Sequence, residues 1–209
     1  MSAEEILKIR DQQIKDQKKG ITFGEFWTQF RTNLSTSYHI LFSLCFVFIA
    51  TFIVFPGGFF VSYWTFLDGS RSTDDAWYNL ATILTFNVCD TIGRKLGGKL
   101  MISSGKVIAG SFLRSIFVIL VILIALDGGD SKQWFFEADW FKITNLVLFS
   151  ISNGYISTQC TIWAPQFVEE EQREQVGFLN GSFIGLGILI GSIIAIPAGA
   201  PLPNHWATA

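Results

Sequence analysis

Five long apolar segments, separated by short clusters of charged residues, constrain the fold of this 209-residue chain more than any other feature. A helix needs about 20 mostly apolar residues to cross the roughly 30 Å hydrocarbon core of a bilayer. Half of the residues are hydrophobic and only 15% are charged, which excludes an ordinary soluble domain. The sequence therefore predicts an all-α, polytopic membrane protein with five transmembrane helices at residues 38–64, 77–94, 107–126, 143–164 and 176–198.

The remaining residues complete the predicted layout. Residues 1–37 form a polar N-terminal arm, in which Phe23, Phe26, Trp27 and Phe30 recur at helical spacing. This apolar face near residues 21–30 indicates either a helix lying in the membrane interface or one packed on the protein itself. Residues 38–198 form the five-helix bundle, and residues 199–209 form a short outer tail.

The distribution of basic residues predicts the orientation in the membrane. Eleven Lys and Arg lie on the side of the N-terminal arm, and only Arg71, Lys132 and Lys142 lie on the other side. Because basic residues are retained on the inner side, we expect the N-terminus inside and, with five spans, the C-terminus outside. The inner side is either the cytosol of a plasma membrane or the matrix of a mitochondrial inner membrane, and the sequence does not choose between them.

Several classes of function are disfavoured. A net charge of −2 without a basic patch gives no support to nucleic-acid binding. Cys45, Cys89 and Cys160 each lie in an apolar run, and neither Cys nor His occurs at the spacing of metal ligands. No catalytic triad, paired carboxylate or phosphate-binding loop is recognisable. We therefore expect no enzyme activity, no metal and no cofactor.

Two places in the apolar segments carry charge, and a charge inside a bilayer usually faces a bundle interior or marks a pathway. Asp90 and Arg94 are four residues apart, so they share one helix face and can pair. This pair is either a polar site, with Asp90 accepting from a substrate and Arg94 donating, or a clamp between helices. Arg114 lies inside the third segment and needs a partner such as Asp90 or a main-chain carbonyl group.

The fourth and fifth segments carry residues suited to close helix packing. Asn153 and Tyr155 add polar groups, so the predicted intramembrane network consists of Asp90, Arg94, Arg114, Asn153 and Tyr155. Gly154 is suited to close approach of another helix. In the fifth segment, glycines predict close packing on another helix, in this bundle or in an oligomer. Gly177, Gly181 and Gly185 repeat at four-residue spacing, and Gly187 and Gly191 follow at the same spacing on a shifted face.

The order of these motifs resembles the C-terminal part of the equilibrative nucleoside transporter family over residues 38–198. The most specific motif is FNxxDxxGR, which runs from Phe86 to Arg94. The others are Val54-Phe55-Pro56-Gly57, Leu113-Arg114, Ser152-Asn153-Gly154-Tyr155, Ala164-Pro165 and Arg173-Glu174 with Gly177. The resemblance implies a major-facilitator-like bundle and a nucleoside or nucleobase as substrate. It also implies that Asn87, Asp90 and Arg94 bind the substrate.

The family resemblance implies eleven spans, of which this chain matches the last five. Because facilitators move substrate between two helix bundles, we expect this half not to transport alone. One hypothesis is an accessory or structural subunit of a larger membrane complex, held by other membrane protein subunits and the lipid bilayer. The alternative is half of a split nucleoside or nucleobase transporter that becomes active with another half or as a homodimer.

Overall fold

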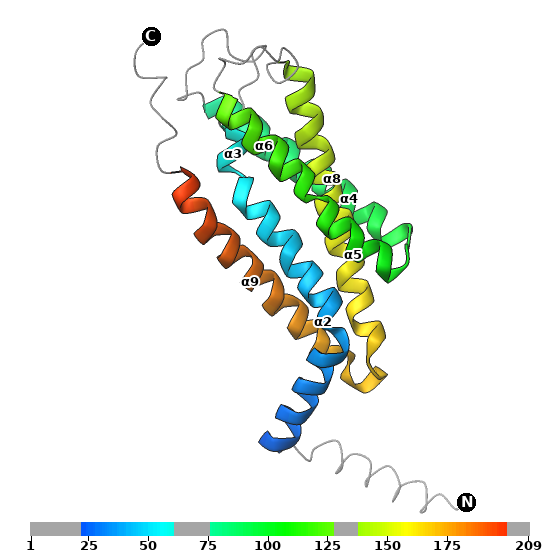
Figure 1. Ribbon diagram of the computed structural model, residues 1–209. Helices are drawn as coiled ribbons and strands as arrows, with labels where there is room; N and C mark the ends of the chain where they lie inside the picture. The colour runs from blue at the N-terminus through cyan, green and yellow to red at the C-terminus, as the bar shows by residue number, and fades with distance from the viewer. Residues whose placement is uncertain (1–21, 61–75, 128–137, 200–209) are drawn as a thin grey trace, which may run out of the picture.

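The computed structural model describes residues 22–60, 76–127 and 138–199, and within these ranges the chain forms helices and contains no strand. This confirms the predicted all-α class. The helices are α2 (Phe23–Val54), α3 (Gly57–Phe60), α4 (Ala76–Lys99), α5 (Ser104–Leu113), α6 (Ser115–Asp127), α8 (Asp139–Trp163), the short 3₁₀ helices η1 (Ala164–Phe167) and η2 (Glu170–Gln172), and α9 (Arg173–Gly199) (Figure 1).

The long helices form a bundle around α2. Helix α9 lies along one side of α2, while α8, α5 and α6 contact other sides of it, and α4 packs mainly on α8 (Figure 1). Three helical stretches are long and apolar enough to cross a membrane: Phe23–Phe59, Ser104–Ile124 and Glu170–Ile196. Helices α4 and α8 have 24 and 25 residues but more polar side chains, so membrane crossing by these two stays a prediction.

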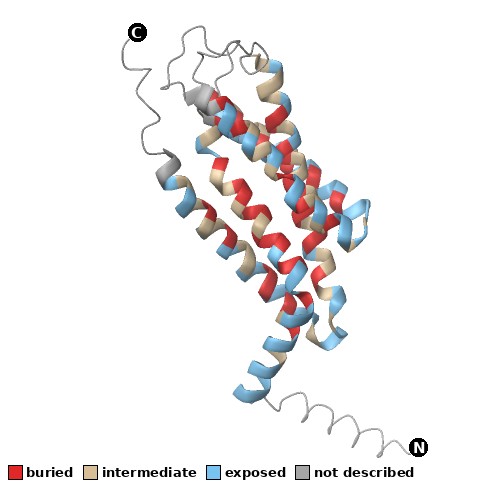
Figure 2. Cartoon of the chain, in the orientation of Figure 1, coloured by how far each residue is buried: buried red, intermediate tan, exposed pale blue. Residues whose placement is uncertain are grey.

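The first helix differs from the predicted layout at both ends. Helix α2 begins at Phe23, where the Glu25 carboxylate accepts a hydrogen bond from the Thr22 N–H, and it continues without a break past Tyr38. Among the described residues, the apolar face near 21–30 is therefore the exposed start of α2, not a separate helix (Figure 2). Residues 1–21 and 200–209 of the arm and tail lie outside the described ranges.

At its other end α2 stops at Val54, ten residues before the predicted end of the first span at Trp64. Phe55 is extended because the following proline disfavours a helical conformation, and the Phe55–Pro56 peptide is cis. Pro56 thus breaks the span predicted over residues 38–64, and α3 starts at Gly57.

The predicted third span is also divided. Arg114 ends α5 and precedes α6, and the Phe117 N–H donates to the Arg114 carbonyl oxygen across only three residues. This tighter turn interrupts the regular helix at the one charged residue of the segment. The guanidinium of Arg114 is directed into the bundle, where it is 2% exposed.

Two glycine contacts set the closest helix approaches. Gly93 and Gly97 of α4 lie against the main chain of α8 at Ile151 and Tyr155. A Cβ atom added at Gly93, or at Gly154 of α8, would overlap main-chain atoms of the other helix. Gly187 and Gly191 of α9 lie similarly against the main chain of α2. Helices therefore approach closely at Gly154, Gly187 and Gly191.

The other three glycines of α9 take no part in packing within the described bundle, which leaves the predicted alternative of packing in an oligomer untested. Gly177, Gly181 and Gly185 are exposed, and a Cβ atom at any of them would meet nothing within 4 Å. They lie on a face of α9 turned away from α2, because α9 offers α2 the face of Gly187 and Gly191. Within the described chain, these three glycines do not pack helices together.

Two buried clusters fill the bundle. An inner cluster joins α2, α5, α8 and α9 around Ile40, Leu44 and Val176. An outer cluster joins α2, α3, α4, α6 and α8 around Phe59, Phe86 and Phe149. Figure 2 shows buried residues along α2 and along the faces that the neighbouring helices turn toward it.

Candidate functional site

The Asp90 and Arg94 pair predicted from their spacing is formed on α4. Arg94 Nε lies 2.7 Å from Asp90 Oδ2, so the two side chains make an ion pair along one helix face. Asp90 is buried, whereas the Arg94 side chain is 49% exposed. The pair therefore has one end inside the bundle and one end at its surface.

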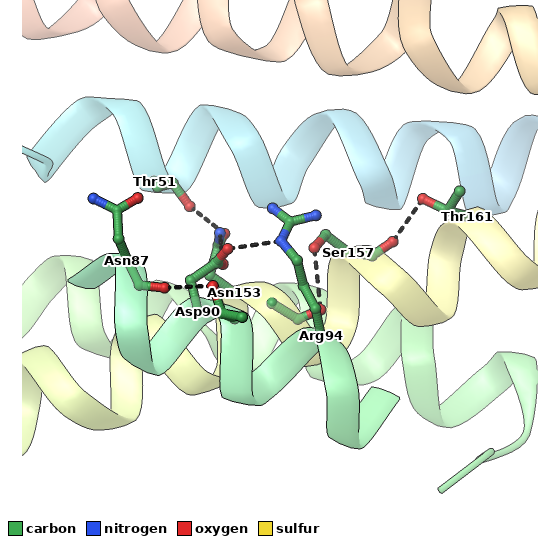
Figure 3. A network of polar contacts seen from close by, with 9 residues as sticks. Thr51, Asn87, Asp90, Arg94, Asn153, Ser157 and Thr161 are labelled. Atoms are coloured by element: carbon green, nitrogen blue, oxygen red, sulfur yellow. Dashed lines mark hydrogen bonds and ion pairs between the residues drawn. The ribbon is translucent and has the colours of Figure 1, made fainter. Parts of the chain in front are cut away.

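Asn153 connects this pair to the neighbouring helices. Its Nδ2 donates to Asp90 Oδ1 over 2.7 Å, and its Oδ1 lies 2.8 Å from the hydroxyl of Thr51 on α2 (Figure 3). Since a carboxylate only accepts, the bond to Asp90 fixes which way the Asn153 amide is turned. Each carboxylate oxygen of Asp90 then has a partner from a different residue.

Arg114 is linked to this group of side chains through Thr51. Its Nη2 lies 3.2 Å from Thr51 Oγ1 and 3.4 Å from the Phe149 carbonyl oxygen, its Nη1 donates to the Val47 carbonyl oxygen, and its Nε donates to Ser152 Oγ. The guanidinium also lies 5.0 Å from the centre of the Phe149 ring. The arginine is thus satisfied by neutral groups of α2 and α8.

Of the two partners expected for Arg114, the structure has main-chain carbonyl groups, those of Val47 and Phe149, and no direct bond to Asp90. Thr51 and Asn153 lie between Arg114 and Asp90, so the chain of bonds runs from Arg114 through Thr51 and Asn153 to Asp90 and Arg94. It joins the α5–α6 break, α2, α8 and α4. This arrangement separates two positive charges with one carboxylate and two neutral side chains.

Two residues of the predicted site lie apart from this chain of bonds. The Tyr155 hydroxyl donates to the Leu100 carbonyl oxygen, so Tyr155 is not a member of the network. Asn87 is exposed, and its Nδ2 donates to the Ile83 carbonyl oxygen of its own helix. Figure 3 shows the Asn87 amide turned away from the Asp90 carboxylate. Asn87 and Arg94 are seven residues apart and therefore share the exposed side of α4.

The sequence did not point to Thr51, Ser152 or Gln159. Gln159 is fully buried, and its amide nitrogen Nε2 donates to the carbonyl oxygens of Gly97 and Leu100. These two hydrogen bonds hold the end of α4 against α8. Trp163 Nε1 donates to the Ile102 carbonyl oxygen. Tyr155, Gln159 and Trp163 recur every four positions on α8, and each carries a side-chain donor. This pattern was the signal in the sequence that could have pointed to a polar contact along one face of α8.

The guanidinium of Arg94 is the part of the site that can bind a ligand. Nη1 and Nη2 have no hydrogen-bond partner among the described residues, and Figure 3 shows them pointing away from Asp90. A guanidinium has donors and no acceptor, so it selects carbonyl, ring-nitrogen, hydroxyl or anionic oxygen groups. Asp90 holds Arg94 in place and, with both of its oxygens bonded, is less available to a ligand.

The model of the family described as "Nucleoside transporter" matches residues 2–197. This chain belongs to the nucleoside transporter family. The expected resemblance is confirmed, and the match extends beyond residues 38–198 into most of the N-terminal arm.

Curated members of the nucleoside transporter family match most of this chain. Human equilibrative nucleoside transporter 1 is 28% identical over 159 residues, which are 75% of this chain and 35% of the relative. Mouse equilibrative nucleoside transporter 2 is 30% identical over 73% of this chain and 34% of the relative. Equilibrative nucleotide transporter 1 of Arabidopsis thaliana is 27% identical over 87% of this chain and 38% of the relative. The chain thus spans a little over a third of the length of these relatives.

Proposed function

We propose that this chain supplies the Asp90 and Arg94 side of a nucleoside-binding site and transports nucleosides only together with a second helix bundle. The observation that carries the proposal is the half-exposed Arg94, held by a buried carboxylate with two of its nitrogens free among the described residues. Nucleosides offer matching acceptors in the carbonyl oxygens and ring nitrogens of the base and in the ribose oxygens.

The role of Asp90 in this proposal differs from direct acceptance of substrate hydroxyl groups. Its Oδ1 accepts from Asn153 and its Oδ2 accepts from Arg94, so the carboxylate positions the guanidinium. A fixed guanidinium loses less conformational entropy on binding than a free one. Asp90 is thus a positioning residue, and Arg94 is the substrate contact.

A second bundle is needed because the exposed side of α4 forms one wall only. Arg94 and Asn87 face outward from the described bundle, and water competes for exposed donors. In facilitator-type carriers, substrate sites lie between two bundles that move against each other. The matched relatives are nearly three times as long as the part this chain covers, which leaves room in them for such a bundle.

A different observation supports an accessory role in a larger membrane complex. Gly177, Gly181 and Gly185 form an exposed stripe on α9, and small residues at this spacing allow a second helix to approach closely in a membrane. In that case, helices of other subunits cover the bundle and the Arg94 side chain pairs with one of them. The two candidates therefore differ in what meets Arg94.

Uptake of labelled uridine and adenosine into proteoliposomes distinguishes the candidates. The purified chain is reconstituted alone and together with the first six spans of human equilibrative nucleoside transporter 1. We expect saturable uptake only in the combined vesicles, reduced at least tenfold by Arg94→Gln. Lys95→Gln is the matched control, because Lys95 is exposed on the neighbouring position of α4 and has no place in the site.

Two results would contradict the split-transporter proposal. One is an absence of saturable uptake in every combination, together with purification of the native chain in a stoichiometric complex of unrelated subunits. The other is uptake that is indifferent to Arg94→Gln. Either result would favour the accessory role instead.

A further inference from the structure

The interface of α4 and α8 contains two buried polar side chains that the Asp90 network does not reach. Thr82 is 0% exposed and Asn145 is 4% exposed. Thr82 Oγ1, Asn145 Oδ1 and Asn145 Nδ2 have no hydrogen-bond partner in the part of the chain that the structure describes. Buried polar groups are rarely left without a partner, so these three atoms call for an explanation.

Thr82 is also unusual among the helical hydroxyl residues of this chain. Thr91 on the same helix and Ser150 on α8 each donate to the carbonyl oxygen four residues earlier, and nine further Ser and Thr side chains do the same. Thr82 does not make this bond. Its hydroxyl is therefore free to interact across the helix interface.

The register of the two helices places Thr82 opposite Asn145. Asp90 and Asn153, whose side chains are hydrogen-bonded, are 63 positions apart in the sequence. One turn earlier on each helix, Phe86 and Phe149 are also 63 positions apart, and their ring centres are 6.2 Å apart in space. Helices α4 and α8 thus run in parallel, with contacts repeating every four residues. The next step toward their N-termini pairs Thr82 with Asn145, which are also 63 positions apart.

The surroundings of this pair are apolar. Tyr78 and Phe86 lie one turn to either side of Thr82, while Leu146 and Phe149 lie next to and one turn after Asn145. All four belong to the outer cluster of aromatic and aliphatic side chains. Their side chains cannot satisfy an amide and a hydroxyl, apart from the Tyr78 hydroxyl, which donates to the Phe59 carbonyl oxygen.

We propose that Thr82 and Asn145 bind an internal water molecule between α4 and α8, about 12 Å along α4 from Asp90. The two side chains do not bond to each other or to any other described residue. A water molecule both donates and accepts, so it can bridge the hydroxyl to the amide. Both side chains are neutral, and a neutral pair suits water better than an ion.

The site gives the α4–α8 interface two different ends. At Gly93 and Gly154 the helix main chains touch, and no room is left for a solvent molecule. At Thr82 and Asn145 the helices are joined through water, with the Phe86 and Phe149 rings separating this site from the charged network. The interface is thus hydrated at Thr82 and Asn145, whereas the contact at Gly93 and Gly154 excludes water.

Hydroxyl-radical footprinting in ¹⁸O-labelled water tests the proposal, because buried side chains next to an internal water molecule incorporate its oxygen. Phe86 and Phe48 form a matched pair, since both are phenylalanines with 8% exposure and only Phe86 lies next to the proposed site. We expect at least threefold more ¹⁸O incorporation at Phe86 than at Phe48 in the full chain. Equal incorporation at the two residues would overturn the proposal.

The double variant Thr82→Val/Asn145→Leu removes the polar groups at similar volume. We expect ¹⁸O incorporation at Phe86 to fall to the level of Phe48, and unchanged incorporation in the folded double variant would also overturn the proposal. Thr161→Val is the control, because its hydroxyl is bonded to the Ser157 carbonyl oxygen of the same helix. If the double variant does not fold, the comparison of Phe86 with Phe48 in the unmodified chain still decides.

Discussion

The buried charge of Arg114 shows how a single residue shapes the bundle. Four acceptors from α2 and α8 surround its guanidinium, and they include two main-chain carbonyl oxygens and two hydroxyl groups. The three nitrogens of a guanidinium donate hydrogen bonds in fixed directions, so a single side chain can bond to several helices at once. Arg114 therefore fixes the relative positions of α2 and α8, which apolar packing alone would constrain less.

Replacement of Arg114 by lysine tests this role. Lysine keeps the charge but cannot reach the acceptors on α2 and α8 together, and we expect the free energy of unfolding to fall by about 3 kcal/mol. The midpoint of thermal unfolding in detergent measures the effect. Arg94→Lys is the control, since Arg94 is half-exposed with one bonded nitrogen, and its midpoint is expected to change much less. Equal midpoints for Arg114→Lys and the unmodified chain would contradict the expectation.

At the level of helix pairs, the contact of α4 with α8 depends on the absence of a side chain at Gly154. A Cβ atom there would overlap the Asp90 carbonyl group and come within 2.7 Å of the Arg94 main-chain nitrogen. Main-chain atoms inside a helix cannot move aside individually, so the helices would have to separate. That separation would also stretch the bond between Asn153 and Asp90.

We expect Gly154→Ala to destabilise the chain by about 1–3 kcal/mol or more. Gly181→Ala is the matched control on an exposed helix position with nothing within 4 Å, and alanine there should stabilise the isolated chain by about 0.5–1 kcal/mol. Thermal unfolding in detergent compares both variants with the unmodified chain. A midpoint for Gly154→Ala at or above that of Gly181→Ala would show that the helix contact is looser than described.

The turn between α4 and α5 is held by α8 through Gln159. Its amide bonds to the carbonyl oxygens of Gly97 and Leu100, and its Oε1 lies 3.4 Å from the Ile102 main-chain nitrogen. We expect Gln159→Leu to speed hydrogen exchange of the amide groups at residues 100–103 by about tenfold, which corresponds to roughly 1.4 kcal/mol of local opening. Hydrogen exchange read by mass spectrometry measures this.

Thr161→Val is the control for Gln159→Leu. Its hydroxyl bonds within α8 and does not contact the turn, so exchange at residues 100–103 should stay unchanged. If amide hydrogen exchange at residues 100–103 is as slow in Gln159→Leu as in the unmodified chain, Tyr155 and Trp163 hold the turn without the glutamine.

For the whole molecule, parallel α4 and α8 place the α4–α5 turn and the segment after α8 at one end of the bundle. The start of α9 lies at the same end as the start of α2, because Gln175 bonds to Asn33 and to Gln29. Basic residues Arg31, Lys99, Lys106 and Arg173 are gathered there. This end is expected to be the inner one by the distribution of charge.

Cysteine labelling in a variant without Cys45, Cys89 and Cys160 tests that orientation. Lys106→Cys and Glu170→Cys are exposed positions at the end expected to be the inner one, while Ala138→Cys precedes α8 at the other end. An impermeant maleimide added to sealed inside-out vesicles should label the first two and spare the third. Labelling of Lys106→Cys and Glu170→Cys from opposite sides would contradict the arrangement of the helices. Labelling of Ala138→Cys alone would show that the orientation in the membrane is the reverse of the expected one.

Local patterns in the sequence determined the helical class and the ion pair of Asp90 and Arg94, and the proline that breaks the first span is itself visible in the sequence. Each of these depends on residues within about one helical turn, so spacing and residue type suffice. The family also followed from motifs that can be read in order along the chain. In contrast, the continuity of the helix near 21–30 with the first span was not predicted, because polar residues between two helical segments do not by themselves end a helix.

Only the tertiary structure decided which faces of the helices meet. Thr51 and Asn153 are separated by 102 positions, and their place between Arg114 and Asp90 depends on how α2 packs against α8. The same holds for α9, where Gly187 and Gly191 contact α2 while Gly181 is exposed. Both sets of glycines repeat every four residues, and small side chains permit a close contact without selecting a partner. The partner is selected by the packing of the larger side chains around them.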